Sequence, residues 1–415
     1  NSIFSYAEAR LDTESLSGDV LNDALYHRTR EVEDRLNVDI NVIDQDYWSE
    51  NPVSYITNIV MSGEDSVDAC FIGVQKNVTA ITNGIYADLN DISELDFNKP
   101  WWDSNTRKYY EIDGKLYTAL GEASMNIHDS LWALFFNKDI LENSGLEDPY
   151  ALVRDGKWTL DKMYSLVEVA GNDIDGDGTL GAGDQWGLMT HNGSAFAFLH
   201  GAGCRGVDME NGVPYVCDID DKMVSAYEKI RTLFSAKATM TDDKMSGKLG
   251  YTCTEGFQNN HGLFLAEVFG HAAKLRAMDT DFGIIPYPKL DENQKEYVAY
   301  YSPATNGFCV PKTAKDYSRT GTVIEVMSAL GYRDVRPVYY DVVLTGKTAR
   351  DNESVEMLDI IFSNIESELA YIYQWGGYSE TIKNVATGTK DIVSTLTSKK
   401  EATEKAIDKF IDSLQ

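Results

Sequence analysis

The apolar residues of the first 90 positions alternate between helical and strand spacing. A helix is predicted from about Gly18, with its apolar face at Leu21, Ala24, Leu25, Val32 and Leu36. VDINVI (38–43) is spaced like a strand, VSYITNIVMSG (53–63) like a helix, and VDACFIG (67–73) is an apolar run typical of a parallel strand buried on both faces. This alternation predicts an α/β fold whose parallel sheet binds ligands at the carboxyl ends of its strands.

The same alternation resumes further along the chain. LWALFFN (131–137) is predicted as a core strand, and DFGIIPYP (281–288) and GFCVP (307–311) as later strands. Helices are predicted at about 159–170, 220–237 and 263–278, and over most of the chain from GFCVP to Gln415. No period of 20 to 50 residues recurs, so the pattern does not indicate a repeat array.

Length and charge narrow this picture. A chain of 415 residues predicts two or three compact units. Its 37 basic and 66 acidic side chains give a formal net charge of −29, which repels phosphate backbones and anionic membranes, so no nucleic-acid partner is expected. Five cysteines contain no C-x-x-C pair. Cys204 and Cys217 flank a turn and are predicted either to bridge a hairpin or to remain separate buried thiols.

One acidic loop has the ligand spacing of a calcium site. GNDIDGDGTLGAGDQWG (171–187) places Asp173, Asp175, Asp177 and Asp184 at positions 1, 3, 5 and 12, and Thr179 at position 7 offers its carbonyl. A helix capped by Thr159 enters the loop, but the glycines after position 12 allow no exit helix. These five residues predict a structural Ca²⁺ site. The alternative is a solvated turn whose carboxylates accept backbone hydrogen bonds.

Short catalytic signatures are absent from the sequence, which disfavours the enzyme classes that carry them. His261 and His271 flank Glu267 on one predicted helix, but their spacing is not that of a metal-ligand pair, so core or surface histidines are expected. A glycoside hydrolase remains an alternative because its two carboxylates are paired in space and not in sequence. A surface adhesin or structural calcium protein is a third alternative.

Aromatic residues beside polar ones indicate a carbohydrate site. Trp101 and Trp102 are adjacent, and Trp375 precedes two glycines that are expected to expose its ring. Flat aromatic faces suit the C–H faces of sugar rings, while neighbouring polar side chains fix the hydroxyls. For any single aromatic residue, a place in the core is the competing interpretation.

Several long segments resemble extracellular solute-binding proteins of family 1, the sugar-binding receptors of ABC importers in Gram-positive bacteria. FFNKD followed by the KWTLD helix is the most specific combination. The segments are KPWWD (99–103), GKLYTALGEASMNIHDSLWALFFNKDILENSGLEDPY (114–150), KWTLDKMYSLVEVA (157–170), DFGIIPYPKLDENQKEYVAYYSP (281–303), CVPKTAKDYSRTGTVIEVMSAL (309–330) and YYDVVLTGKTARDNESVEMLDIIF (339–362).

The resemblance implies a two-lobed periplasmic-binding-protein-like fold of type II, the maltose type, with a hinge. Lobe 1 would comprise residues 1–130 and 283–335, lobe 2 residues 131–282 and 336–415, with crossings near 128–134, 279–284 and 333–340; NSIFSY would supply the first strand. The implied ligand-binding residues are Trp101, Trp102, Ser124, Asn126, Tyr301, Asn306 and Trp375.

The implied function is capture of a carbohydrate, expected to be an oligosaccharide, and its delivery to the transmembrane subunits of an ABC permease. The protein is expected to be a monomer without catalytic residues, lipid-anchored on the extracellular face of the cell membrane. A peptide-binding receptor of the same fold is a further alternative.

Overall fold

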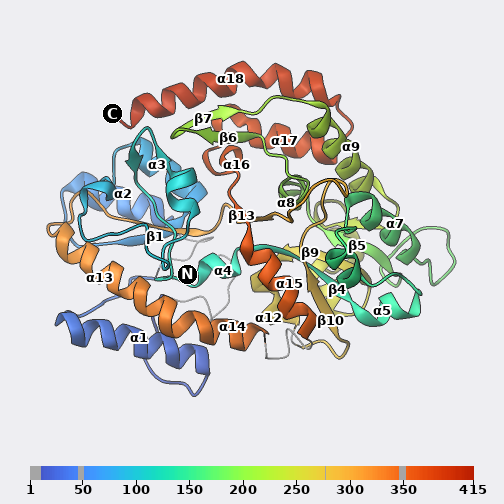
Figure 1. Ribbon diagram of the computed structural model, residues 1–415, viewed down its shortest axis with the longest axis horizontal. Coiled ribbons are helices and arrows are strands. Elements are labelled where there is room, and N and C mark those ends of the chain that lie inside the picture. The colour runs from blue at the N-terminus through green and yellow to red at the C-terminus, as the bar shows by residue number, and fades with distance from the viewer. Residues whose placement is uncertain (1–10, 45–50, 276, 345–351) are drawn as a thin grey trace.

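Two sheets organise the chain, and each lies in its own half of an elongated molecule (Figure 1). The structure, a computed structural model, describes residues 11–44, 51–275, 277–344 and 352–415. The small sheet pairs β1 (Cys70–Gly73) with β12 (Asn306–Cys309). The central sheet has five strands in the order β10, β4, β9, β5 and β8.

The central sheet is mixed and deeply buried. Its strands are β4 (Trp132–Asn137), β5 (Trp186–Thr190), β8 (Thr239–Thr241), β9 (Gly262–Val268) and β10 (Phe282–Ile285). β5 runs parallel to β8 and β9, whereas β4 runs antiparallel to β9 and β10. The predicted strands in LWALFFN and DFGIIPYP are therefore confirmed, and every residue of β4 is buried.

Three sequence expectations about strands were wrong. The strand predicted in 67–73 exists as β1, but it pairs with β12 in antiparallel register, because its partner arrives from a distant part of the chain. The helix predicted at 263–278 is mainly the strand β9, whose seven residues are all buried; a short apolar run does not distinguish a buried strand from a buried helix. VDINVI forms no strand, and its Ile43 is exposed.

NSIFSY lies outside the described residues. The predicted helices at 159–170 and 220–237 are confirmed as α7 (Leu160–Ala170) and α9 (Asp221–Ser235). The Thr159 side chain caps α7 by accepting a hydrogen bond from the Lys162 backbone N–H.

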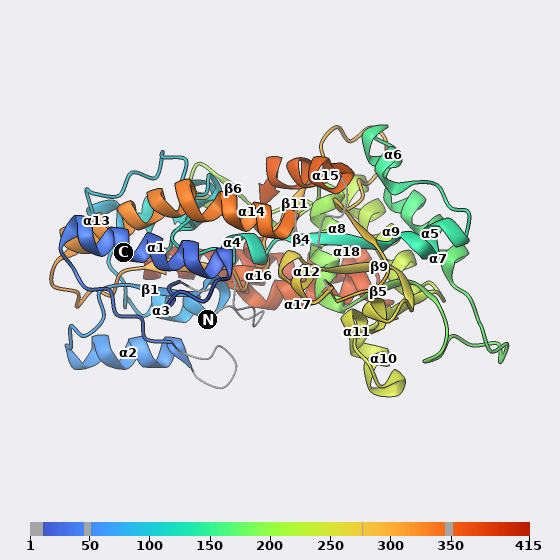
Figure 2. The same cartoon turned by 90° about the horizontal axis from the view of Figure 1, so that it is seen from below.

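Helices cover both sheets. Those around the small sheet are α1 (Val20–Leu36), α2 (Pro52–Ser62), α3 (Val74–Thr82), α13 (Tyr317–Leu330) and α14 (Arg336–Leu344). Those around the central sheet are α5 (Lys138–Asn143), α6 (Pro149–Arg154), α8 (Ala195–Gly201), α10 (Asp242–Leu249), α11 (Cys253–Gln258) and α12 (Ala272–Leu275), with α7 and α9. Figure 2 shows α2 and α10 projecting on the same side of the molecule, one from each half.

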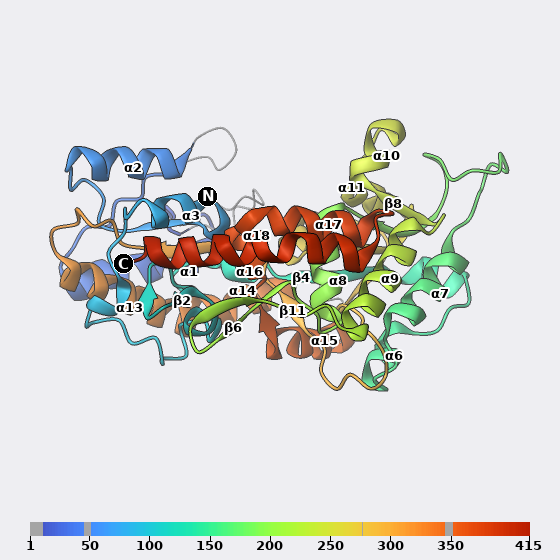
Figure 3. The same cartoon turned by 90° about the horizontal axis from the view of Figure 1, so that it is seen from above.

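The remaining elements are short strands and helices, together with the C-terminal helices. They are β2 (Glu111–Ile112), β3 (Lys115–Leu116), α4 (Asn126–Asp129), β6 (Val207–Glu210), β7 (Val213–Val216), β11 (Ala299–Tyr300), α15 (Asn352–Ser363), β13 (Ile365–Glu366), α16 (Leu369–Tyr373), α17 (Tyr378–Thr387) and α18 (Ile392–Ser413). α18 runs along the molecule from the central-sheet half toward the small-sheet half (Figures 1 and 3). In the part of the chain that is described, no helix is both long and apolar enough to cross a bilayer.

Candidate ligand-binding site

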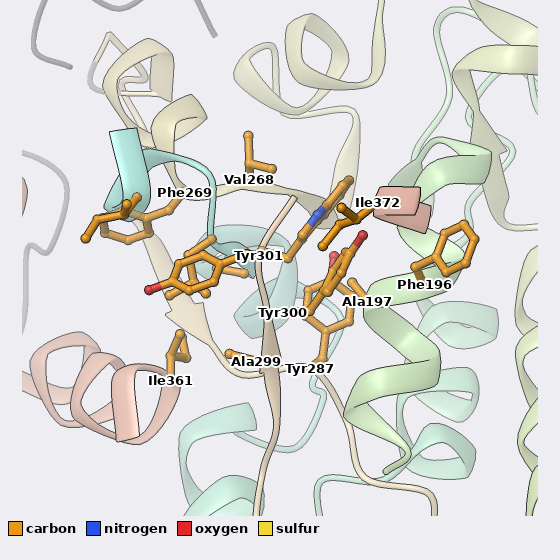
Figure 4. Packing of buried hydrophobic residues seen from close by; sticks show 14 of the residues in the cluster. Phe196, Ala197, Val268, Phe269, Tyr287, Ala299, Tyr300, Tyr301, Ile361 and Ile372 are labelled. Atoms are coloured by element: carbon orange, nitrogen blue, oxygen red, sulfur yellow. The ribbon is translucent and has the colours of Figure 1, made fainter. Parts of the chain in front are cut away.

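Three chain segments meet side by side between the two halves. β11 and β13 pair in parallel, and Leu131, just before β4, forms an antiparallel bridge with Tyr301. The Ser302 backbone N–H donates to the Ser130 carbonyl at 2.9 Å, which ties two of the segments together. Tyr300 and Tyr301 point to opposite sides of the β11 segment (Figure 4). We call this region the junction; the side chains around it form the candidate site.

Three of the residues predicted to bind ligand lie together on the small-sheet side of the junction. The Asn126 side-chain oxygen accepts from the Asn306 backbone N–H at 2.6 Å, and the Ser124 hydroxyl accepts from the Asn126 backbone N–H at 3.4 Å. All three residues are buried. The Asn126 side chain holds the start of β12 against α4, so sequence reasoning brought together residues that share one polar cluster.

The other predicted residues are placed by packing and internal hydrogen bonds. The indole N–H groups of Trp101 and Trp102 both donate to the Glu325 carboxylate at 2.9 Å, while the Trp102 ring packs on Phe97. The buried Tyr301 hydroxyl donates to Asp103 at 2.8 Å. Burial raises the pKa of Asp103 and, separately, that of Glu325.

Trp375 lies in the core. Its side chain is 4% exposed and stacks on Tyr373 with ring centroids 4.5 Å apart. The two glycines that follow it do not expose the ring: Gly376 and Gly377 have φ values of 59° and 70° and turn the chain into α17. The indole therefore presents no open face in this conformation.

A cavity of about 400 Å³ borders Ser124 and Asn306. It runs beside β1, between residues 38–44 and helix α13, and its walls include Ile40, Ile72 and Met327. The lining also includes the aromatic residues Tyr55 and Phe71 and the charged residues Asp39, Asp68 and Arg319. A second candidate for the ligand-contacting face lies on the other side of the junction.

A polar and aromatic cluster occupies that other side, at the edge where the parallel strands β5 and β9 end. Trp132 begins β4, His191 follows β5, and Glu267 lies near the end of β9. The ring centroids of Trp132 and His191 are 5.2 Å apart, and His191 Nε2 lies 3.7 Å from Glu267 Oε1. His271 Nε2 lies 3.8 Å from Glu267 Oε2. We call these four residues the Trp132 cluster.

The indole of Trp132 is the distinctive member of this cluster. The side chain is 5% exposed, and its N–H has no hydrogen-bond partner among the residues that the structure describes. A buried N–H without an acceptor costs free energy, so a ligand oxygen there would be stabilised. Burial lowers the pKa of His271, and the nearby Glu267 opposes this shift only in part.

Sequence reasoning missed the Trp132 cluster. Residues 263–278 were expected to form one helix, which would have placed His261, Glu267 and His271 along a helix face. Instead His261 precedes β9 and His271 follows it. Ligands of α/β folds bind at the carboxyl ends of parallel strands. Had β5 and β9 been recognised as parallel strands, this rule would have selected the polar residues at their carboxyl ends.

The acidic loop forms the predicted turn, with β5 and no helix after it. Asp173, Asp175 and Asp177 have ligand atoms within 4.8 Å of one another, so they could hold a metal ion. Asp173 accepts from the Gly176 and Gly178 backbone N–H groups at 2.7 Å each, and Gly178 at position 6 has a φ of 91°. Asp175 and Asp177 likewise accept from the backbone N–H groups of Asp177 and Thr179, so each carboxylate also satisfies hydrogen-bond donors of the turn.

Asp184 and Thr179 are arranged differently from the other predicted ligands. The buried Asp184 accepts from the backbone N–H groups of Gly181 and Ile174 at 2.6 and 2.8 Å, which lowers its pKa. The Thr179 hydroxyl donates to Asp177 at 2.8 Å. Asp184 lies outside the group of carboxylates close enough to share one ion, which comprises Asp173, Asp175 and Asp177, and the Thr179 carbonyl remains a predicted ligand.

Solved structures match this fold over nearly the full chain. The galacto-N-biose/lacto-N-biose I-binding protein of the ABC transporter from Bifidobacterium longum, in complex with lacto-N-biose, is 12% identical with a TM-score of 0.64; the match covers 96% of this chain and 95% of that chain. The maltose/maltodextrin-binding domain MalE from Bdellovibrio bacteriovorus, bound to maltotriose, is 15% identical with a TM-score of 0.59, covering 93% and 96%.

UgpB from Mycobacterium tuberculosis, in complex with glycerophosphocholine, is 15% identical with a TM-score of 0.62, covering 93% of this chain and 95% of that chain. No protein-family model and no curated protein matches the sequence. These structural matches confirm the predicted α/β, periplasmic-binding-protein-like fold of the maltose type.

Proposed function

We propose that the protein is the extracellular substrate-binding component of an ABC importer, and that it captures an oligosaccharide between two lobes and delivers it to the permease subunits. The fold supports this proposal, and two of the matched proteins are complexed with maltotriose and lacto-N-biose. Glycerophosphocholine bound by UgpB shows that the fold alone does not fix the ligand. The ligand class must therefore be argued from this chain's own residues.

The Trp132 cluster is the observation that carries the sugar assignment. An indole has an apolar face and an N–H donor, His191 lies beside it, and Glu267 has two acceptor oxygens for hydroxyl groups. Because Trp132 is 5% exposed, the halves must move before a ligand can reach its indole. Across the junction, Ser124, Asn126 and Asn306 supply small polar groups. Movement of the halves about the junction would bring both sides against one ligand.

The predicted lobe boundaries remain part of this proposal. The bridge between Leu131 and Tyr301 supports the predicted crossing near 128–134, and the crossings near 279–284 and 333–340 remain predictions. Anchoring to the extracellular face by a lipid also remains a prediction. For Trp101, Trp102 and Trp375, contact with a ligand requires rearrangement of the packing described above.

Calorimetric titration tests the ligand class. Maltotriose, lacto-N-biose, longer glycans, glycerophosphocholine and a short peptide are titrated into the full chain. Saturable heat with a glycan that mass spectrometry recovers intact supports the proposal. Heat only with glycerophosphocholine or the peptide contradicts the sugar assignment, and hydrolysis products contradict a receptor in favour of a glycoside hydrolase.

Removal of the Trp132 indole N–H tests whether the Trp132 cluster binds the ligand. Trp132→Phe keeps an aromatic face but removes the N–H donor, so the dissociation constant of the bound glycan is expected to rise by about tenfold, which corresponds to one hydrogen bond. Trp186→Phe is the matched control. Trp186 is also buried in the central sheet, but it begins β5, whereas His191 and the rest of the Trp132 cluster lie at the other end of that strand. Equal affinities for both variants would contradict a role for Trp132.

We also propose that the acidic loop binds Ca²⁺ as a structural site. Its three clustered carboxylates repel one another unless a cation joins them, and the sequence spacing is that of a calcium loop. An ion bound only to the folded state raises the melting temperature by mass action. Calcium is therefore expected to raise the melting temperature, and a chelator to reverse this.

Two variants separate a calcium site from a solvated turn. Asp173→Asn keeps an acceptor for the turn but removes a ligand charge, so its melting temperature should no longer respond to calcium. Asp291→Asn is the control, because Asp291 also accepts two backbone N–H groups in a turn but does not belong to the triad. A wild-type melting temperature that is insensitive to calcium and chelator would support the solvated turn.

A further inference from the structure

Two cysteines far apart in the sequence lie directly opposite each other in the small sheet. Cys70 opens β1 and Cys309 closes β12, and they are register partners in the antiparallel pairing. Opposite residues of an antiparallel pair point to the same face of the sheet. The two thiols therefore share one environment, although 239 positions separate them in the chain.

The hydrogen-bond pattern between β1 and β12 sets the distance between the Cα atoms of the two cysteines. The Val74 backbone N–H donates to the Thr305 carbonyl at 2.8 Å, and that pair lies four register steps from Cys70 and Cys309. Because hydrogen-bonded and non-hydrogen-bonded pairs alternate, the cysteines form a hydrogen-bonded pair with a Cα separation of about 5.5 Å. Disulfides commonly join cysteines whose Cα atoms are about 4.4 to 6.8 Å apart.

The surroundings set which thiol reacts first. Cys309 is fully buried, and its sulfur accepts a hydrogen bond from the Asn77 side chain at 2.7 Å. Cys70 is half-buried, so it is the more accessible of the two. All five cysteines lie in the described part of the chain and are free thiols, including Cys204 and Cys217.

We propose that Cys70 and Cys309 are an oxidisable pair that closes to a disulfide between β1 and β12. The Cys70 thiolate attacks the disulfide of an external oxidant, such as glutathione disulfide, and forms a mixed disulfide while one glutathione thiolate leaves. The Cys309 thiolate then attacks the Cys70 sulfur and expels the second glutathione. Two thiols are oxidised, one external disulfide is reduced to two thiols, and the two protons pass to the leaving groups.

The bond would close a ring from Cys70 to Cys309 that contains every strand of the central sheet. It would hold β1 and β12 together covalently, even when the half that contains the central sheet moves. Exchange is expected to be slow at neutral pH, because a hydrogen bond with Cys309 and burial raise the pKa of Cys70 and keep the attacking thiolate scarce. Its rate should rise with pH.

Peptide mapping of the oxidised full chain tests this pair. The protein is incubated with glutathione disulfide, its remaining thiols are alkylated, and it is digested without reductant. Before alkylation the expected product is two hydrogens lighter than the reduced chain. After alkylation and digestion it contains a peptide in which Cys70 is linked to Cys309, and the other three of the five cysteines are alkylated. Alkylation of all five cysteines, or a link between Cys204 and Cys217 instead, would overturn the proposal.

Single substitutions sharpen the mapping. Cys204→Ser should form the Cys70–Cys309 link at the wild-type rate. Cys309→Ser should stop at a glutathione adduct on Cys70, which identifies Cys70 as the attacking thiol. Because Cys309 is in the core and Cys70 is not, Cys70→Ser serves as the second test: it should acquire neither the link nor an adduct on Cys309. An adduct on Cys309 there would contradict the order of attack.

Discussion

His200 is held between two carboxylates at the junction. It projects from α8, is fully buried, and stacks on Tyr300 with ring centroids 4.8 Å apart. Its Nδ1 lies 3.3 Å from Glu366 and its Nε2 lies 3.3 Å from Glu368. Burial alone would lower the pKa of His200, but the hydrogen bonds to Glu366 and Glu368 outweigh it and raise the pKa. The charged imidazolium is therefore the stable form in this fold.

This arrangement predicts how stability depends on pH. Because the folded pKa of His200 is raised, its contribution is fully present below the unfolded value of about 6.5 and is lost as pH rises through the folded pKa. Hydrogen bonding and charge from His200 outweigh burial and lower the pKa of Glu366 to about 2, so its contribution is lost as pH falls from about 4.5 toward that value. The cluster should stabilise the protein best between about pH 4.5 and 6.5.

The His200→Gln variant should be less stable than wild type by roughly 3–5 kcal/mol near pH 6, because it leaves the buried Glu368 without its cation, whereas Glu366 keeps its ion pair with Arg205. Its melting temperature should also fall less steeply between pH 6 and 9. Chemical denaturation and thermal melts across that range measure both effects. The exposed His27 provides the control variant His27→Gln. A wild-type pH slope in His200→Gln would show that another group controls alkaline stability.

Individual residues also show which parts of the candidate site could be predicted from the sequence and which could not. Ser124, Asn126 and Asn306 were selected by resemblance and do share one cluster. Trp132 was one aromatic residue among many, and the apolar run that contains it was assigned to a core strand. Its indole N–H, like those of Trp186 and Trp375, has no partner in the described structure, but it lies beside His191, and this position depends on neighbours that no local pattern shows.

At the scale of elements, amphipathic helices were predictable and the direction of buried strands was not. α7 and α9 have polar faces and capping residues that mark their ends. β1 and β9 are mainly apolar runs of four and seven residues. Such a run indicates that a segment is buried, but it does not show which strand it pairs with or whether the pairing is parallel. The site depends on these strands: the carboxyl end of β9 carries Glu267, so assigning it to a helix removed the Trp132 cluster from view.

At the scale of the whole molecule, α18 connects the two halves. It packs on α17 and α9 beside the central sheet, and at its far end the Leu414 carbonyl accepts from the Tyr117 hydroxyl at 3.3 Å. A small gap there is lined by Ile81, Tyr117 and Tyr373 together with Phe410 and Leu414. This end of the helix therefore contacts the small-sheet half as well as α16.

Phe410 should be the anchor of this connection. Its buried ring lies 5.0 Å from the ring of Tyr373 and 5.5 Å from that of Trp375. Phe410→Ala is expected to lower the free energy of unfolding by about 3–5 kcal/mol through lost burial and the cavity that remains. Because the lost contacts join the halves, calorimetry should show one wild-type transition dividing into two. Val393→Ala, at an exposed position of the same helix, should melt within about 0.5 kcal/mol of wild type. If Phe410→Ala instead melts in one transition at the wild-type temperature, the halves are held together at the junction alone, and α18 merely lies across them.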